Sequence, residues 1–166
     1  MNFSDIDVFG DFGRALKEAK KEAKEQEKFL KTLNCANGKR NFELISPFLK
    51  KLNESACLQW SESPIMKKIY IETDKIGFGM MDNYFSISFV RSDGSKSPWI
   101  RFIVDLDRQM LIPTYYQNDD FGFYCHTVPE KNKCDLVGLR MADNSLHQCL
   151  QFIAEYGITP DDFSVC

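Results

Sequence analysis

The spacing of apolar positions changes along the chain from helical to alternating and back to helical. Near the N-terminus, apolar residues and one Gln recur at alternating intervals of four and three residues, which is the heptad pattern of coiled-coil helices. The residues at these positions are Phe12, Leu16, Ala19, Ala23, Gln26, Leu30 and Leu33. This pattern predicts a helix over residues 14–33, preceded by a flexible or loosely docked stretch over residues 1–13. Ser46 as N-cap and Pro47 at the first helical position predict the start of a second helix.

From Lys67 onward, apolar residues recur at every second position, which is typical of strands. The predicted strands cover residues 67–73, 76–81, 84–91, 99–105, 110–116 and 121–127. The connections between them are too short for a parallel crossover, so an antiparallel meander is expected. Pro113 has no N–H to donate, which predicts that its strand is either an edge strand or bulged at that point.

Helical spacing returns near the C-terminal end, where four apolar residues fall on one side of a helix: Leu146, Cys149, Leu150 and Ile153. Asp143 or Asn144 is its predicted N-cap, and residues 136–139 before it are consistent with a short strand. A chain of 166 residues is the size of one domain. We therefore expect a single α+β domain over residues 1–166, with two N-terminal helices, an antiparallel β-meander of five to six strands and a C-terminal helix.

Strand alternation assigns the side chains of the meander to two faces. One face is apolar and is expected to form the core under the helices: Phe85, Ile87, Phe89, Ile100, Phe102, Val104, Phe121, Phe123 and Cys125. The other face carries Tyr84, Ser86, Ser88, Trp99, Arg101, Thr114, Tyr116, Tyr124 and His126.

Trp, Tyr and Arg are enriched at protein interfaces, so this second face is predicted to bind a partner protein. The residues predicted to do so are Trp99, Arg101, Tyr116, Tyr124 and His126. Two alternatives stay open. A helix covers this face and makes it a second core, or the rings stack nucleic-acid bases, for which Arg91 and Arg101 supply few positive charges.

Charge is distributed unevenly along the chain, although the net charge is only −3. Residues 14–31 contain seven basic and four acidic residues, whereas residues 105–166 contain ten acidic and four basic ones. Complementary charge steers association, so the acidic half predicts a partner with a basic surface. The acidic residues predicted to take part are Asp105, Asp107, Asp119 and Asp120.

Two alternative functions follow from the charged residues. The first is nucleic-acid binding through the basic helix, by Lys17, Lys20, Lys21, Lys24 and Lys28. It ranks second because the interspersed glutamates repel phosphates. The second alternative is a metal-dependent hydrolase or nuclease that uses the same four aspartates, or the sequence Glu72-Thr73-Asp74-Lys75, as ligands for Mg²⁺.

The six cysteines show no spacing typical of zinc sites or redox motifs, and the chain has only two histidines. The N-terminus lacks the apolar stretch of a signal peptide, and no run of eighteen apolar residues occurs. A cytoplasmic protein with reduced thiols and no membrane span is therefore expected. Cys57 and Cys149 are predicted in the core, and Cys166 as an exposed thiol.

Together these patterns favour a small non-enzymatic protein that binds another protein, of the inhibitor, immunity or accessory type. No catalytic residue, metal site or cofactor is predicted. The heptad pattern of the first helix also allows a weak homodimer, although the protein is otherwise expected to be a monomer.

Overall fold

The computed structural model describes residues 8–52, 55–61, 68–73 and 83–166. Its helices are α1 (Val8–Leu30), α2 (Gly38–Leu52) and α3 (Leu136–Glu155). Its strands are β1 (Cys57–Ser61), β2 (Lys68–Thr73), β3 (Tyr84–Val90), β4 (Lys96–Asp105), β5 (Met110–Asn118), β6 (Phe123–His126) and β7 (Ser164–Val165). A short 3-10 helix, η2 (Pro160–Asp162), precedes β7. The strand predicted over residues 76–81 lies outside the described residues.

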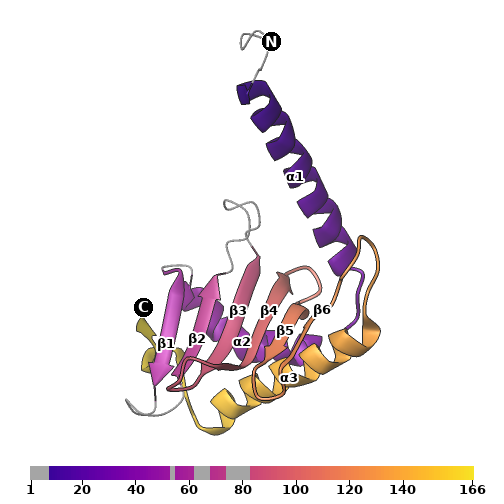
Figure 1. The fold of residues 1–166 in the computed structure, drawn as a ribbon. Helices are drawn as coiled ribbons and strands as arrows, with labels where there is room; N and C mark the ends of the chain where they lie inside the picture. Colours follow the sequence, from indigo (N-terminus) through magenta and orange to yellow (C-terminus); the bar gives the residue numbers. More distant parts are fainter. Residues whose placement is uncertain (1–7, 53–54, 62–67, 74–82) are drawn as a thin grey trace.

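The described strands form one antiparallel sheet in the order β6-β5-β4-β3-β2-β1-β7. Strands β1 to β6 are neighbours in sequence order, and β7 adds itself to the outer side of β1 (Figure 1). The predicted α+β fold, with two N-terminal helices, an antiparallel meander and a C-terminal helix, is confirmed.

Helices α2 and α3 pack on the same face of this sheet (Figure 1). One cluster of buried side chains joins them to the strands. Its helical members are Ile45, Phe48, Leu52, Ala142, Leu146, Cys149, Leu150 and Ile153, and the strands contribute Leu58, Ile69, Ile71, Phe85, Ile87, Ile100, Phe102, Val104 and Leu111. Burial of these side chains is the main favourable contribution to folding. The predicted core face is correct here except for Phe121, which is 81% exposed in the turn before β6.

A second buried cluster covers the other face of the sheet at one end only. There Tyr84, Ile103 and Ile112 pack with Leu30, the last residue of α1, and with Cys35 in the α1–α2 connection. Side chains at this end of β4 are therefore buried on both faces. Toward the opposite end of β4, the described helices leave uncovered the face that lies away from α2 and α3.

Helix α1 rises away from the sheet and touches the rest of the protein mainly near its C-terminal end (Figure 1). It begins at Val8 rather than at Arg14, so part of the predicted N-terminal stretch is helical. Leu30 is fully buried, whereas Phe12 is 66% exposed. An ion pair of 3.1 Å between Glu25 and Lys131 fixes the lower part of α1 to the loop after β6.

The second helix begins at Gly38, eight positions earlier than its predicted N-cap Ser46, and contains Pro47 in its interior. The missing N–H of Pro47 is tolerated there, and the Ser46 hydroxyl donates to the Phe42 carbonyl at 2.5 Å. Residues 57–61, for which no strand was predicted, form the strand β1.

The C-terminal helix begins at Leu136 instead of near Asp143, and residues 136–139 are its first turn rather than a strand. Asp135 is the N-cap, because its side chain accepts a hydrogen bond from the Gly138 N–H at 2.9 Å. Leu136 and Val137 are about 70% exposed. Leu139 of the same run is buried in the second cluster, so only the end of the run reaches the core.

The C-terminal segment is tied to β1 by a disulfide between Cys57 and Cys166. The prediction of a reduced core Cys57 and an exposed Cys166 thiol is therefore wrong. Phe163 packs edge-on against Phe48 with 5.2 Å between ring centroids. Lys51 Nζ donates to the carbonyls of Pro160 and Phe163, both at 2.7 Å. None of the helices within the described ranges is long and apolar enough to span a lipid bilayer.

Asp105 and Arg108 connect the β4–β5 hairpin to the chain between α1 and α2. The Asp105 carboxylate, 2% exposed, accepts from Arg108 Nε at 2.6 Å, and the same guanidinium donates to the Leu33 carbonyl at 2.9 Å. Burial alone would raise the pKa of Asp105, but the hydrogen bonds and charge of Arg108 together outweigh it and lower the pKa.

Replacing Arg108 by Gln is expected to lower the free energy of unfolding at neutral pH by about 3 kcal/mol, because Asp105 is left as an unpaired buried charge. The contribution of Asp105 is complete above its ordinary pKa of about 4 and is lost as the pH falls through its lowered folded-state pKa. The difference between wild type and R108Q should thus shrink in acid. Urea unfolding at pH 7 and at pH 3 measures it, and equal stability at pH 7 would contradict the role of this pair.

The disulfide closes a loop with a sequence separation of 109 residues. Because such a loop restricts the unfolded chain strongly, Cys166→Ser is expected to lower the free energy of unfolding by about 2–5 kcal/mol. Chemical denaturation of both proteins, with and without a reductant, tests this. The reductant should destabilise the wild type and leave C166S unchanged; an equal response of the two proteins would refute the bond.

Candidate protein-binding face

The uncovered part of the sheet is formed by neighbouring positions on β4, β5 and β6. Trp99 on β4 lies opposite Gln117 on β5, and Arg101 lies opposite Tyr115. Strand β6 extends both of these cross-strand pairs, because its His126 lies opposite Tyr115 and its Tyr124 lies opposite Gln117. We call this surface the aromatic face and define it by Trp99, Arg101, Tyr115, Tyr124 and His126.

A bulge in β5 decides which tyrosine belongs to this face. Arg101 pairs with Tyr115 and the next β4 residue pairs with Pro113, so Thr114 is an extra residue without a partner on β4. The prediction that Tyr116 lies on the aromatic face is therefore wrong. The extra residue turns Tyr116 to the helix side, where it is buried in the core, and turns Tyr115 outward.

The rings of the aromatic face contact one another in a row. The Trp99 and Tyr115 rings meet nearly edge-on with centroids 5.3 Å apart, and the Tyr115 and His126 rings are 4.9 Å apart. The Tyr115 hydroxyl donates to Gln117 Oε1 at 2.8 Å. Such ring pairs hold each other in place, so the shape of this face is largely preformed.

Two cations lie against the Trp99 ring. Lys96 Nζ is 4.0 Å and the Arg101 guanidinium carbon 4.5 Å from its centroid, both within the range of cation–π attraction. The indole Nε1 of Trp99 is buried and has no hydrogen-bond partner among the described residues. A buried N–H without an acceptor is costly.

Exposure increases across the face toward the sheet edge. Trp99, Arg101 and Tyr115 are half-buried, whereas His126 is exposed and Tyr124 is 70% exposed. Strand β6 has only one neighbour in the sheet, so its outer side is an edge. The surface therefore combines a shielded centre of Trp, Arg and Tyr with an accessible rim, which is the usual anatomy of a binding site.

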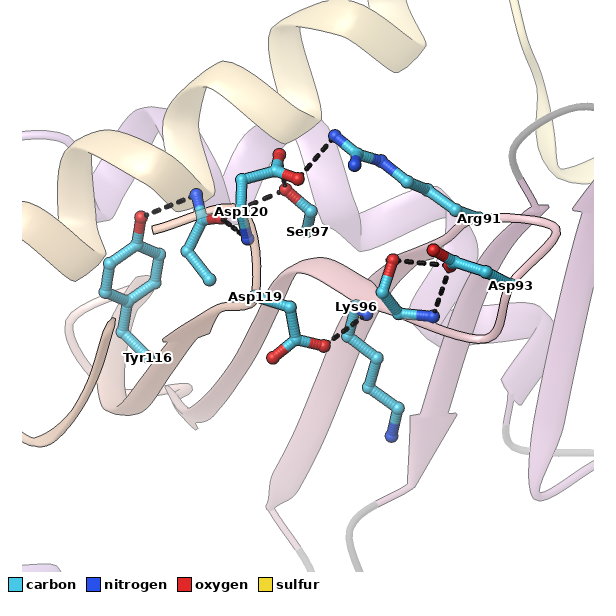
Figure 2. A network of polar contacts seen from close by, with 9 residues as sticks. Arg91, Asp93, Lys96, Ser97, Tyr116, Asp119 and Asp120 are labelled. Atoms are coloured by element: carbon cyan, nitrogen blue, oxygen red, sulfur yellow. Dashed lines mark hydrogen bonds and ion pairs between the residues drawn. The ribbon is translucent and has the colours of Figure 1, made fainter. Parts of the chain in front are cut away.

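Asp119 and Asp120 lie in a polar network that joins the β3–β4 and β5–β6 hairpins (Figure 2). Asp119 accepts from the Lys96 N–H at 2.6 Å, and this hydrogen bond lowers the pKa of Asp119. Asp120 accepts from the Ser97 hydroxyl and pairs with Arg91 at 2.5 Å. These two predicted partner-binding residues therefore hold the end of the aromatic face in shape.

The four predicted aspartates do not form one acidic surface. Asp119 binds Lys96 at the start of β4, while Asp105 is the last residue of the same strand. Asp105 is buried in its pair with Arg108, and Asp107 is exposed in the β4–β5 turn. Asp105 and Asp107 are thus separated by the length of a ten-residue strand from Asp119 and Asp120, roughly 30 Å.

Metal binding by these aspartates has no geometric support. Among the described residues, no group of three or more His, Cys, Asp or Glu side chains is placed to hold a metal ion. Asp74 and Lys75, the end of the four-residue sequence considered above, lie outside the described ranges.

The cysteines and histidines are not arranged as nucleophile and base. His147 Nδ1 lies 2.8 Å from Asn41 Oδ1, and His126 packs on Tyr115. Burial raises the pKa of Cys35 to about 12 and raises the pKa of Cys125 above its ordinary value. These thiols therefore stay protonated at neutral pH and are weak nucleophiles.

The lysines predicted for nucleic-acid binding are all exposed on α1: Lys17, Lys20, Lys21, Lys24 and Lys28. Four of them follow one another at intervals of four and three residues, so they form one row along the helix. Glutamates line the neighbouring row, and one of these, Glu25, pairs with Lys131. The helix thus carries both signs of charge along its length.

Three residues of the aromatic face or its border were missed in the sequence: Tyr115, Lys96 and Gln117. Pro113 was the available signal, because the bulge it predicts shifts every later β5 residue to the opposite face. No sequence pattern predicts the contact of Lys96 with Trp99, because it depends on the backbone conformation at the start of β4.

Comparison of the chain with models of protein families, with curated proteins and with solved structures finds no match.

The assignment of the two tyrosines to opposite faces can be tested by stability. Tyr116→Ala is expected to lower the free energy of unfolding by about 3 kcal/mol, because it removes a buried ring. Tyr124→Ala is expected to change it by less than about 0.5 kcal/mol, because that ring is exposed. Thermal or urea unfolding of both variants measures this, and a larger loss for Tyr124→Ala would reverse the assignment.

Proposed function

We propose that this protein binds another protein through the aromatic face, as an inhibitor, immunity or accessory protein does. The observation that carries the proposal is the row of Trp99, Tyr115 and His126, which α2 and α3 leave uncovered. A sheet face that is merely hydrated typically shows Lys, Glu and Thr. Trp, Tyr and Arg are the residue types that contribute most to binding energy at interfaces.

The chemistry of the face indicates what the partner offers. The Lys96 ammonium and the Arg101 guanidinium both lie beside the Trp99 ring. A partner group that accepts hydrogen bonds, such as a carboxylate or a backbone carbonyl, fits this centre. An apolar side chain next to that group fits against Tyr124 at the rim.

A partner with a basic surface was expected from the acidic half of the chain. That expectation required Asp105, Asp107, Asp119 and Asp120 to act together, and the first is buried while the last two hold the hairpins. Asp107 remains the accessible charge of this set. We therefore propose that the partner is selected mainly by the aromatic face and that Asp107 contributes only to the rate of encounter.

We propose a cytoplasmic location, as the sequence pattern indicates. The free thiols of Cys35, Cys125, Cys134 and Cys149 fit a reducing compartment, whereas disulfides persist mainly in oxidising ones. The bond between Cys57 and Cys166 departs from this pattern. The packing of Phe163 on Phe48 adds a non-covalent contact that holds the C-terminal segment.

The proposal predicts that a partner contacts Tyr124 but not Tyr156. Both tyrosines are exposed, at 70% and 63%, and Tyr156 ends α3 away from the aromatic face. A photo-crosslinking phenylalanine analogue is placed at each position, and each purified protein is irradiated in lysate of the organism that encodes it. We expect a discrete protein adduct from position 124 and none of the same mass from position 156.

Competition makes this result specific to the face. Excess wild-type protein or Tyr156→Ala should suppress the adduct, whereas Tyr124→Ala should suppress it less well, because it removes one contact at the rim of the face. Identical adducts at both positions, or equal suppression by both variants, would refute the proposal. An adduct that disappears after nuclease treatment would instead favour nucleic-acid binding.

A further inference from the structure

Helix α1 has an apolar side that nothing else in the described chain covers. Beyond its last turns the helix stands clear of the sheet (Figure 1), and Phe12 is 66% exposed while Leu16 is only partly buried. Phe12, Leu16, Ala19 and Ala23 follow one another at intervals of four, three and four residues, so they lie on one side of the helix. We call this side the heptad seam.

A free-standing helix gains little stability from its own hydrogen bonds, and most helices in proteins depend on packing of their apolar side. The polar residues of α1 do not remove this need, because they occupy the other sides. The heptad seam therefore indicates a helix that is packed in the functional state.

We propose that a second copy of this chain covers the heptad seam, through its own α1 in antiparallel orientation. In one antiparallel register, Phe12 of each copy lies opposite Ala23 of the other, and Leu16 lies opposite Ala19. Each of the four layers then pairs one large side chain with one methyl group. Such alternation of large and small residues lets two helices approach closely and fill the space between them.

A parallel pair fits the same sequence less well. In register, it would stack Phe12 on Phe12 and Leu16 on Leu16 and leave Ala19 and Ala23 facing their own copies. Two overfilled layers would then be followed by two underfilled ones. It would also bring Glu22 of one copy near Glu27 of the other at the flanking positions, where like charges repel. In the antiparallel register, Lys20 and Glu22 instead face Gly13 and Ala15.

A groove at the base of α1 continues the heptad seam. It has a volume of about 300 Å³ and lies between the helix residues Glu22, Gln26 and Phe29 and the loop residues Val128 and Pro129. Side chains on a helix lean toward its N-terminus. In the antiparallel pair, the Phe12 ring of one copy therefore leans from Ala23 of the other copy toward this groove.

The two-fold symmetry of such a pair satisfies both copies at once, because each chain carries one exposed Phe12 and one groove. The sheet and the remaining helices of the two copies then lie toward opposite ends of the helix pair. With four layers the interface is small, so a weak dimer whose population depends on concentration is expected. The aromatic face is not part of this contact and stays available in both copies.

Sedimentation equilibrium of the purified full chain tests the dimer. Over loading concentrations from about 1 to about 500 µM, the wild type is expected to shift from monomer to dimer, as a micromolar dissociation constant implies. The double variant F12Q/L16Q should stay monomeric over this range. Since both side chains are at least partly exposed and Gln favours helices, circular dichroism should show an unchanged fold at low concentration.

The matched control is K17Q/K21Q, which makes two substitutions to the same residue on the other side of α1. It should dimerise like the wild type. A wild type that stays monomeric at the highest concentration would overturn the proposal, and so would an F12Q/L16Q variant that dimerises normally.

Orientation is tested separately by placing the photo-crosslinking analogue at position 12 and mixing labelled protein with isotopically heavy protein. Crosslinks between light and heavy peptides can form only between copies. The antiparallel pair predicts adducts within residues 22–29 or at the 128–132 loop of the other copy. Adducts between position 12 and position 12 would establish a parallel pair and refute the proposed register.

Discussion

The structure depends on the packing of α2 and α3 against the same face of one antiparallel sheet. With α2 and α3 on one side, the buried cluster has strand residues such as Ile87 and Ile100 on one wall and helix residues such as Phe48 and Leu146 on the other. The opposite face needs no helix for stability, except where the end of α1 closes it around Ile103. The aromatic side chains on that face thus lie outside the core.

The bulge at Thr114 decides the composition of that face. One additional residue in β5 places Tyr115 rather than Tyr116 beside Arg101 and Trp99. Without it, the Tyr116 ring would leave the core. The polar network of the two hairpins, with Asp119 on the Lys96 N–H and Asp120 on Arg91, then fixes the strand ends on either side of the face. The same few residues therefore determine both the register of the sheet and the shape of its exposed surface.

Much of the fold could be predicted from the sequence, because alternation and short connections are local signals. The meander, the core positions of β3 and β4 and the helix around Leu146 follow from them directly. The candidate site was predicted in part: Trp99, Arg101, Tyr124 and His126 are on the uncovered face, but Tyr116 is not. What the sequence could not show depends on contacts between distant segments. The burial of Asp105 against Arg108, the bond between Cys57 and Cys166 and the contact of Lys96 with Trp99 all belong to this kind.

The covalent link between β1 and residue 166 also determines how the protein responds to mechanical force. All strands and α3 lie within the loop that this disulfide closes. Tension applied between the N-terminal helix and residue 166 passes through α1 and α2 to Cys57, and from there directly across the sulfur atoms. While the bond is intact, this tension does not pull the strands apart, and only the chain before Cys57 can be extended. Reduction of the bond transfers the force to β7, whose two residues then become the first part of the sheet to separate.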